Sequence, residues 1–336
     1  MAILTDTIGK NFFGKKIVIV GDLVADQFLR GTITRVSREA PVFILRHDET
    51  ETLAGGAANA AVNVASLGGN AVLVGLIGKD LNGKALLEKL LQADVDCSFV
   101  IATNKYQTTT KIRVLAGQHY APRQQVIRID YENRELITNE LQNKLKNNFF
   151  SAVQDADAII VSDYNYGVAN TLISEISKKI TERKSIPFLV DSRFNLRNFT
   201  GATTATPNQE EVEQILGENF TESDCVELCQ NLGFESLLVT RGNKGMLLIE
   251  KNRAPMSLEA VGAKEPVDVT GAGDTVIAAY ALGLASGLNF SDAANVANHA
   301  GGIVVMKKGT ATVSFDELLA SLEKTERTKQ RANATR

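Results

Sequence analysis

The stretch "KIVIVGD" (residues 16–22) is a short apolar run, rich in β-branched residues, that ends in an acid. Such a run is typical of a strand that is buried on both faces of a parallel sheet. Four similar runs follow: "NAVLVGLIG" (70–78), "DAIIVSD" (157–163), "IPFLVDS" (186–192) and "ESLLVTRG" (235–242). Helical patterns lie among them, over residues 55–67, 81–92, 137–150, 168–181 and 222–231. This alternation predicts an α/β fold with a doubly wound, mostly parallel sheet and helices on both faces.

The ends of the predicted strands carry polar side chains. Four of the five strands end at or near such a residue: Asp22, Asp163, Asp191 and Thr240. In sheets of this kind, ligands gather beyond the carboxyl ends of the strands. The sequence therefore places a candidate ligand site at that edge.

Two segments break the alternation. Residues 28–52 and 106–130 are rich in Thr, Val, Ile and Arg and nearly alternate between apolar and polar positions. We expect them to form a separate small sheet, a lid over the strand ends. Its apolar side must be covered, which predicts a homodimer formed through the lid. Residues 1–320 are then one domain, and the polar segment 321–336 is expected to fray.

Composition and charge limit the classes of partner and the location that we expect. The chain has 336 residues, 44% of them hydrophobic, and a formal net charge of −3, which gives no electrostatic case for nucleic acid or an anionic membrane. The segment "MAILTDTIGKNFFGKK" lacks the layout of a signal peptide, and no run is long enough to span a bilayer. Three cysteines fit a reducing cytoplasm, and Cys225 and Cys229 share a helix face that we expect to point to the core. We expect a cytoplasmic protein.

The stretch "DVTGAGDT" (268–275) joins a small-residue loop to a long apolar run. A helix that starts here leaves the N–H groups of residues 271–274 free to receive an anion. Asp274 follows Gly271, Ala272 and Gly273 directly, where it could take a proton from an attacking hydroxyl if a phosphate occupied the loop. The simpler alternative is a tight turn with Asp274 as a first-turn acid that the helix dipole favours.

Two further motifs allow both a structural and a functional interpretation. In "AGGAANAAVNVASLGG" (54–69), small residues let a helix lie close to the sheet, while Gly55, Gly56 and Asn59 could contact a polyol together with Asp22. In "ATPNQEEVEQILG" (205–217), Asn208 and Glu211 fit a helix-capping box, or could hold a hydrated Mg²⁺ near phosphates.

Two other patterns argue against rival nucleotide folds. "GKDLNGKA" (78–85) follows the phosphate-loop pattern until Ala85, which replaces the Ser or Thr that would hold Mg²⁺. No G-x-G-x-x-G motif follows the first predicted strand. A dinucleotide-dependent oxidoreductase therefore lacks its phosphate-binding fingerprint here.

Taken together, "GGAANAAVNVASLGG" and "DVTGAGDT" resemble the two signatures of the ribokinase (pfkB) family of carbohydrate kinases, and the intervening "TPNQEE" is similar too. The resemblance covers about residues 14–320. It implies a ribokinase-like fold with a β-sheet lid, a sugar substrate, and ATP and Mg²⁺ as cofactors. It also implies roles for the matching positions: Asp274 as catalytic base; Gly271, Ala272 and Gly273 as anion hole; Asp22, Gly55, Gly56, Asn59, Lys111, Arg113 and Asp163 for substrate; Asn208 and Glu211 for Mg²⁺ through water; Thr240, Gly242 and Asn298 for nucleotide.

Within that family the chain is similar to the bacterial heptose 7-phosphate kinases, which phosphorylate an anomeric hydroxyl. That likeness is carried by "RVSREAPV" (35–42), "TKIRVL" (110–115), "VIRID" (126–130), "VSDYNYG" (161–167), "LLVTRGNKGM" (237–246) and "DVTGAGDTV" (268–276). The chain ends before a nucleotidyltransferase domain would begin, so that second activity of the bifunctional heptose enzymes is not expected.

Departures from the heptose kinases leave the acceptor open. Arg38 stands where they usually carry Pro, Asp191-Ser192-Arg193 replaces Asp-Pro-Lys, and residues 117–124 look like a short insertion. The cations Arg38, Lys111, Arg113 and Arg193 favour a phosphorylated acceptor, although surface cations are commonly just solvated. The alternatives are another sugar or sugar phosphate, and a non-catalytic sugar or nucleotide sensor, against which an intact Asp274 argues.

Overall fold

A nine-stranded sheet forms the centre of the protein in the computed structural model. The structure describes residues 2–118, 123–133, 136–184, 186–263 and 265–334. The strand order is β13-β12-β11-β10-β9-β8-β1-β4-β5. Only the pairings β11–β12 and β12–β13 are antiparallel, which confirms the predicted mostly parallel sheet. The strands are β1 (Lys16–Gly21), β4 (Asn70–Gly78), β5 (Asp96–Thr103), β8 (Ala158–Asp163), β9 (Phe188–Ser192), β10 (Thr204–Ala205), β11 (Ser236–Thr240), β12 (Met246–Glu250) and β13 (Met256–Leu258).

Helices cover both faces of this sheet because successive strand residues point to opposite sides. In β1, Ile17 and Ile19 belong to one buried cluster, and Val18 and Val20 belong to the other. The first cluster is closed by α1 (Ala2–Asn11), α2 (Ala57–Ser66), α3 (Leu81–Gln92), α8 (Ala272–Ala285), α9 (Phe290–Val304) and α10 (Phe315–Ala334). The second is closed by α4 (Asn139–Ala152), α5 (Thr171–Lys184), α6 (Gln209–Leu216) and α7 (Glu222–Asn231). The doubly wound architecture is therefore confirmed.

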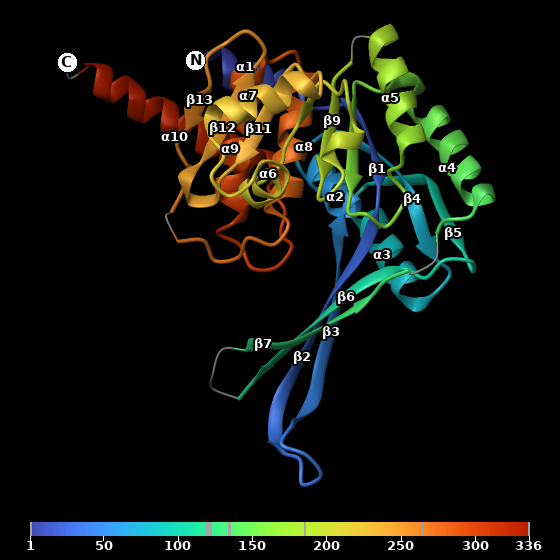
Figure 1. The fold of residues 1–336 in the computed structure, drawn as a ribbon. Coiled ribbons are helices and arrows are strands. Elements are labelled where there is room, and N and C mark those ends of the chain that lie inside the picture. Colours follow the sequence, from blue (N-terminus) through green and yellow to red (C-terminus); the bar gives the residue numbers. More distant parts are fainter. Residues whose placement is uncertain (1, 119–122, 134–135, 185, 264, 335–336) are drawn as a thin grey trace.

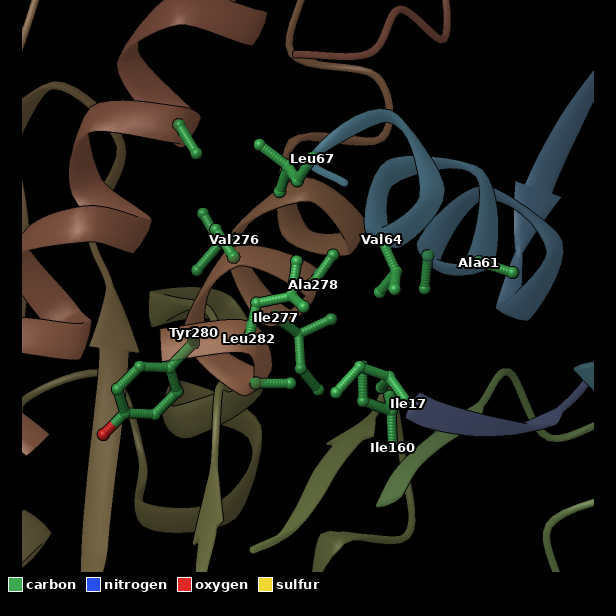
Figure 2. Packing of buried hydrophobic residues seen from close by; sticks show 14 of the residues in the cluster. Ile17, Ala61, Val64, Leu67, Ile160, Val276, Ile277, Ala278, Tyr280 and Leu282 are labelled. Atoms are coloured by element: carbon green, nitrogen blue, oxygen red, sulfur yellow. The ribbon is translucent and has the colours of Figure 1, made fainter. Parts of the chain in front are cut away.

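Helices α2 and α8 pack against each other and against the sheet (Figure 2). Ala61 and Val64 of α2 lie in the same cluster as Ile277 of α8, with Ile17 and Ile160 of the sheet beneath them. Small side chains allow this close approach, since α2 is mostly Ala and Val. This packing brings the two glycine-containing motifs together although they are far apart in the sequence.

A second sheet of four strands extends away from the main body (Figure 1). Its order is β3-β2-β6-β7, with β2 (Leu23–Val36), β3 (Phe43–Gly56), β6 (Thr109–Gly117) and β7 (Gln124–Tyr131). The separate small sheet expected from segments 28–52 and 106–130 is thus present, and we call these four strands the lid sheet. Part of the insertion expected over 117–124, residues 119–122, lies outside the described residues.

The C-terminal segment differs from the expectation. Helix α10 continues through residue 334, so the boundary expected at residue 320 falls inside a helix, and the segment expected to fray is helical as far as the structure describes it. An Arg327–Glu323 ion pair of 3.1 Å, four residues apart, supports the helix beyond its buried part. Helices α1 and α9 were not anticipated from the sequence either. Within the described part of the chain, no helix is both long enough and apolar enough to cross a bilayer.

Candidate active site

Helix α8 begins at the edge of a cavity of about 390 Å³. Its N-cap, Gly271, has φ +77°, a left-handed conformation that glycine adopts without strain. A Cβ at this position would also lie 2.5 Å from the side-chain nitrogen of Asn59. Gly271, Ala272 and Gly273 all line the cavity, as the anion-hole prediction requires.

Asp274 is the third residue of α8 and is only 3% exposed. Burial raises its pKa to about 7, although hydrogen bonds from Asn59 and Tyr164 oppose the shift. The first-turn acid of α9, Asp292, shows the purely structural alternative, because it is exposed and accepts a hydrogen bond from its own N-cap, Asn289. Asp274 instead bonds to residues of other elements and faces the cavity.

The cavity is lined by the carboxyl ends of the main-sheet strands, the start of α8 and the lid sheet. Its walls include Val24, Asp26, Gly56, Lys111, Arg113, Arg128, Asp163, Tyr164, Asp191, Arg193, Thr206, Asn208, Glu211, Thr240, Gly271, Ala272, Gly273, Asp274 and Thr310. The cavity therefore lies at the edge where the sequence places the candidate ligand site, and the lid sheet supplies one wall.

Four cations surround the side of the cavity formed by the lid sheet and β9. Arg113 pairs with Asp26 at 2.6 Å, and Arg128 pairs with Asp130 at 2.6 Å. Lys111 and Arg193 form no ion pair with any residue that the structure describes.

Lys111 is only 7% exposed. Burial lowers the pKa of its ammonium group, and the positive charges of Arg128 and Arg193 lower it further, while Asp26 and Asp130 oppose the shift. Because two cations remain unpaired beside like charges, this part of the cavity favours an anionic ligand.

The structure places other predicted substrate residues differently. Asp22 does not line the cavity; its carboxylate accepts N–H groups of the loop after β8, from Tyr164 (2.9 Å), Tyr166 (3.0 Å) and Val168 (3.1 Å). Burial raises the pKa of Asp22 to about 6. This carboxylate has its hydrogen-bonding capacity largely used by the loop. Gly55 lies behind the wall, where a Cβ would meet the carboxylate of Asp26.

Three more predicted residues differ from expectation: one lies outside the cavity, and two have hydrogen-bond partners that the sequence did not reveal. Arg38 lies exposed in the turn between β2 and β3 and is not part of the cavity wall. Asp163 does line it, but its carboxylate accepts hydrogen bonds from Ser192 (2.7 Å) and Asn195 (3.1 Å). The amide of Asn59 donates to Asp274 at 2.7 Å.

Asn208 and Glu211 form the capping box of α6. The Asn208 side chain accepts from the Glu211 N–H at 2.9 Å, and the Glu211 carboxylate accepts from the Asn208 N–H at 2.9 Å. Both residues also line the cavity, beside Asp191. Burial raises the pKa of Asp191 well above its usual value, and the negative charge of Glu211 adds to the shift. Two neighbouring acids of this kind are suited to a cation.

A second cavity of about 650 Å³ adjoins the first across the start of α8. Asn208, Thr240, Ala272 and Gly273 line both. Thr240, Gly242 and Asn298, predicted to hold a nucleotide, come together here with apolar side chains of Met246, Val261, Val276 and Val305. One N–H of the Asn298 amide is already used by the Glu259 carbonyl at 2.7 Å.

Sequence reasoning missed several residues of the site. Tyr164, Asp26 and Arg128 line the cavity and were assigned no role, although Tyr164 directly follows a strand-end acid. Thr206 and Thr310 also line it, and their buried hydroxyl oxygens have no hydrogen-bond partner among the described residues. Only their position in the wall marks them, since an isolated Thr carries no signal in a sequence.

The glycine-containing pattern at 78–85 is not a phosphate loop. Asp80 is the N-cap of α3 and accepts from the Gly83 N–H at 2.7 Å. Cys225 and Cys229 are buried on α7, as predicted, and no cluster of three or more acids, histidines or cysteines suited to a metal occurs in the described ranges.

Comparison with known proteins assigns the family. The profile of the pfkB family carbohydrate kinases matches residues 15–317. The chain is 41% identical over 310 residues to the bifunctional protein HldE of Haemophilus influenzae Rd, covering 90% of this chain and 62% of that protein. It is 40% identical over 308 residues to the HldE of Pasteurella multocida, with the same coverage of 90% and 62%. The chain thus spans less than two thirds of these curated relatives.

Solved structures show the same fold at low identity. A ribokinase of Arabidopsis thaliana, complexed with ribose and ATP, has a TM-score of 0.70 and 22% identity, covering 92% of this chain and 99% of that one. Phosphofructokinase-2 of Escherichia coli, in complex with potassium, has a TM-score of 0.72 and 17% identity. The match covers 93% of this chain and 100% of that one. The fold is therefore ribokinase-like. From the family profile and the HldE relatives, the chain belongs to the pfkB family of carbohydrate kinases and is a sugar kinase.

Proposed function

We propose that this kinase transfers the γ-phosphate of ATP to a hydroxyl of a sugar phosphate, with Asp274 as the general base. One observation carries the proposal: a buried carboxylate lies directly behind the Gly271–Gly273 loop, in a cavity that also holds the two unpaired cations Lys111 and Arg193. The carboxylate behind the glycine loop suits phosphoryl transfer. The two cations suit a phosphate group that the acceptor already carries and that is not transferred.

Several features of the site support phosphoryl transfer. The N–H groups of Gly273 and Asp274 and the helix dipole stabilise negative charge on the transferred group. The N–H of Ala272 already donates to the Val269 carbonyl at 3.2 Å. Asp274 accepts the proton of the attacking hydroxyl. Asn59 donates to the carboxylate from the far side at 2.7 Å and so limits its rotation. Gly56 lines the wall beside Tyr164, and its backbone would contact the sugar. A Cβ here would lie 2.6 Å from the Asp22 carbonyl oxygen.

We propose heptose 7-phosphate, phosphorylated at its anomeric hydroxyl, as the acceptor. The local motifs "TKIRVL" (110–115) and "VIRID" (126–130), which resemble those of heptose 7-phosphate kinases, supply Lys111, Arg113 and Arg128 to the cavity. Another sugar phosphate is the second candidate, because Arg193, at a position where the heptose kinases carry Lys, lies in the same wall.

We propose that the nucleotide binds in the second cavity and that the metal binds where the two cavities meet. The 650 Å³ cavity has room for a nucleoside and contains Thr240, Gly242 and Asn298. Asn208 and Glu211, with Asp191 nearby, are suited to Mg²⁺ held through water, because Mg²⁺ keeps several waters and needs few carboxylates. When bound, Mg²⁺ neutralises charge on the phosphates. The hydroxyl of Thr206, which has no hydrogen-bond partner among the described residues, lies in the same wall and is available to the hydrated metal.

Activity is expected to fall as the pH drops below about 7. Burial raises the pKa of Asp274 to about 7, and only the ionised carboxylate can accept the proton. The acid limb of kcat/KM, measured from pH 5 to 9 with saturating Mg·ATP, should therefore lie near neutrality. A profile that stays flat down to pH 5, as an ordinary Asp with a pKa near 4 would give, would contradict the role of a buried base.

The direct test is ADP release from Mg·ATP with a panel of acceptors: heptose 7-phosphate, fructose 6-phosphate, ribose 5-phosphate and the unphosphorylated sugars. Turnover with heptose 7-phosphate alone supports the full proposal. Turnover only with another sugar phosphate keeps the mechanism and changes the acceptor. ATP binding without turnover of any acceptor would instead favour a sensor.

We also propose that the protein is a homodimer joined through the lid sheet. Every residue of β7 is exposed, and Ile127 and Ile129, which share one face of this strand, are 54% and 41% exposed. Phe43, at the start of β3, is 60% exposed. Apolar side chains gathered on a thin sheet need a cover. We expect a dimer in light scattering and a monomer for Ile127→Asp; Phe13→Asp, on the distant N-terminal part, should stay dimeric.

A further inference from the structure

Both carboxylate oxygens of Asp274 receive hydrogen bonds from other elements. Asn59 of α2 donates to Oδ2 at 2.7 Å, and the hydroxyl of Tyr164, in the loop after β8, donates to Oδ1 at 3.2 Å. Asn63 donates to Oδ1 of Asn59 at 3.1 Å and accepts from the Thr275 hydroxyl at 2.9 Å. The amide on one side of Asp274 is thus itself fixed by a buried network.

The loop that carries Tyr164 is held firmly. The three N–H groups that Asp22 accepts, those of Tyr164, Tyr166 and Val168, fix the backbone of this loop against the end of β1. The ring of Tyr164 packs against Gly56, where a Cβ would lie 3.4 Å from two ring carbons. With its backbone and its ring both constrained, Tyr164 has little freedom to move its hydroxyl away from Asp274.

We propose that Tyr164 is a positioning residue for the base: its hydroxyl fixes Oδ1 of Asp274 and so orients the carboxylate. The second lone pair of Oδ2, which also accepts from Asn59, then faces the acceptor hydroxyl. This inference rests on the proposed function. It also gives Asp22 a purpose other than sugar binding, because that carboxylate holds the loop on which Tyr164 sits. The sequence neighbour Tyr166 serves no such role, since its hydroxyl donates to the exposed Glu132 at 2.7 Å.

The hydrogen bond also acts on the ionisation of the base. A donated hydrogen bond stabilises the carboxylate, so its loss raises the pKa of Asp274. Tyr164 remains a donor throughout, because burial, the largest cause, raises the pKa of its phenol well above the ordinary value. The other charged groups that act on Asp274 come from three strands: Asp26 of β2, Lys111 of β6 and Asp191 of β9.

The test compares Tyr164→Phe with Tyr166→Phe. Both changes remove one phenolic oxygen and keep a ring near Lys111, whose ammonium lies 5.6 Å and 5.7 Å from the two ring centroids. In Tyr164→Phe the acid limb of kcat/KM should move up by about one pH unit. The loss should be about tenfold at pH 6 and small at pH 9. In Tyr166→Phe the limb should stay in place. A loss that is equal at every pH, or an unmoved limb, overturns the inference.

A second variant covers the case in which Tyr164→Phe does not fold. Incorporation of 3-fluorotyrosine at position 164 keeps the hydroxyl and makes it a stronger donor, so the acid limb should move to lower pH. A limb that stays in place or moves upward contradicts the proposed hydrogen bond.

A readout without substrate separates this inference from the proposed function. The carboxyl band of Asp274, taken as the infrared difference between wild type and Asp274→Asn, can be titrated in both Tyr164 backgrounds. A higher midpoint in Tyr164→Phe supports the inference even if no sugar is turned over, in which case only the proposed function fails. Equal midpoints overturn the inference even if the kinase is active.

Discussion

Replacing Asp274 by asparagine is expected to lower kcat at least ~10²-fold, because the amide cannot accept the proton of the acceptor hydroxyl. The change is nearly isosteric, and Asn59 can still donate to the remaining oxygen, so the site should keep its shape. ATP binding should therefore survive. The measurement is single-turnover phosphoryl transfer at pH 8, above the pKa of about 7 of the Asp274 carboxyl, together with nucleotide binding by calorimetry.

The matched control is Asp292→Asn. Asp292 is also the third residue of its helix, α9, but it is exposed and bonds to its own N-cap. If the acid at this helix position only complements the helix dipole, both variants should change stability slightly and neither should change turnover. A rate for Asp274→Asn within a few fold of wild type would remove Asp274 from the mechanism.

Replacing Lys111 by methionine is expected to raise KM for the phosphorylated acceptor by ~10²-fold or more, since truncating one partner of a buried charge pair is costly. The ammonium is buried beside Arg128 and Arg193, and the nearby acids Asp26 and Asp130 are ion-paired with Arg113 and Arg128. A phosphate on the acceptor would supply a counter-charge. Methionine keeps most of the apolar stem, so the packing against Tyr164 should persist.

The specificity of this effect separates a phosphate contact from a structural one. Turnover of the corresponding unphosphorylated sugar should change little in Lys111→Met, so the preference for the phosphorylated acceptor should collapse. Lys105→Met is the control, because Lys105 is exposed and pairs with Glu140 at 2.9 Å away from the cavity. An equal loss for both kinds of acceptor would show that Lys111 supports the fold of the site and not the phosphate.

Much of the architecture could be predicted because it depends on local patterns. The runs at 16–22, 70–78 and 157–163 are apolar on both faces, and they form neighbouring parallel strands β1, β4 and β8. The helix expected over 81–92 is α3 with the same bounds, since Asp80 caps it and its apolar spacing is regular. The lid sheet followed from alternation in two segments. The segment 321–336 was expected to fray because it is polar. As far as the structure describes it, it continues α10, whose buried residues Leu318 and Leu322 lie near the start of the helix.

The sequence by itself determined the fold class, the start of α8 and the position of Asp274, because a glycine loop before an apolar helix fixes local backbone geometry. Only the tertiary structure decided what each polar side chain bonds to. Asp22 and Asn59, expected to contact sugar, bond to a loop and to Asp274. Tyr164 reaches Asp274 from a loop without a motif. The physical reason is that a hydrogen bond depends on distances of a few tenths of an ångström between distant segments. Those distances are set by the packing of α2, α8 and the strand ends, and no local pattern records them.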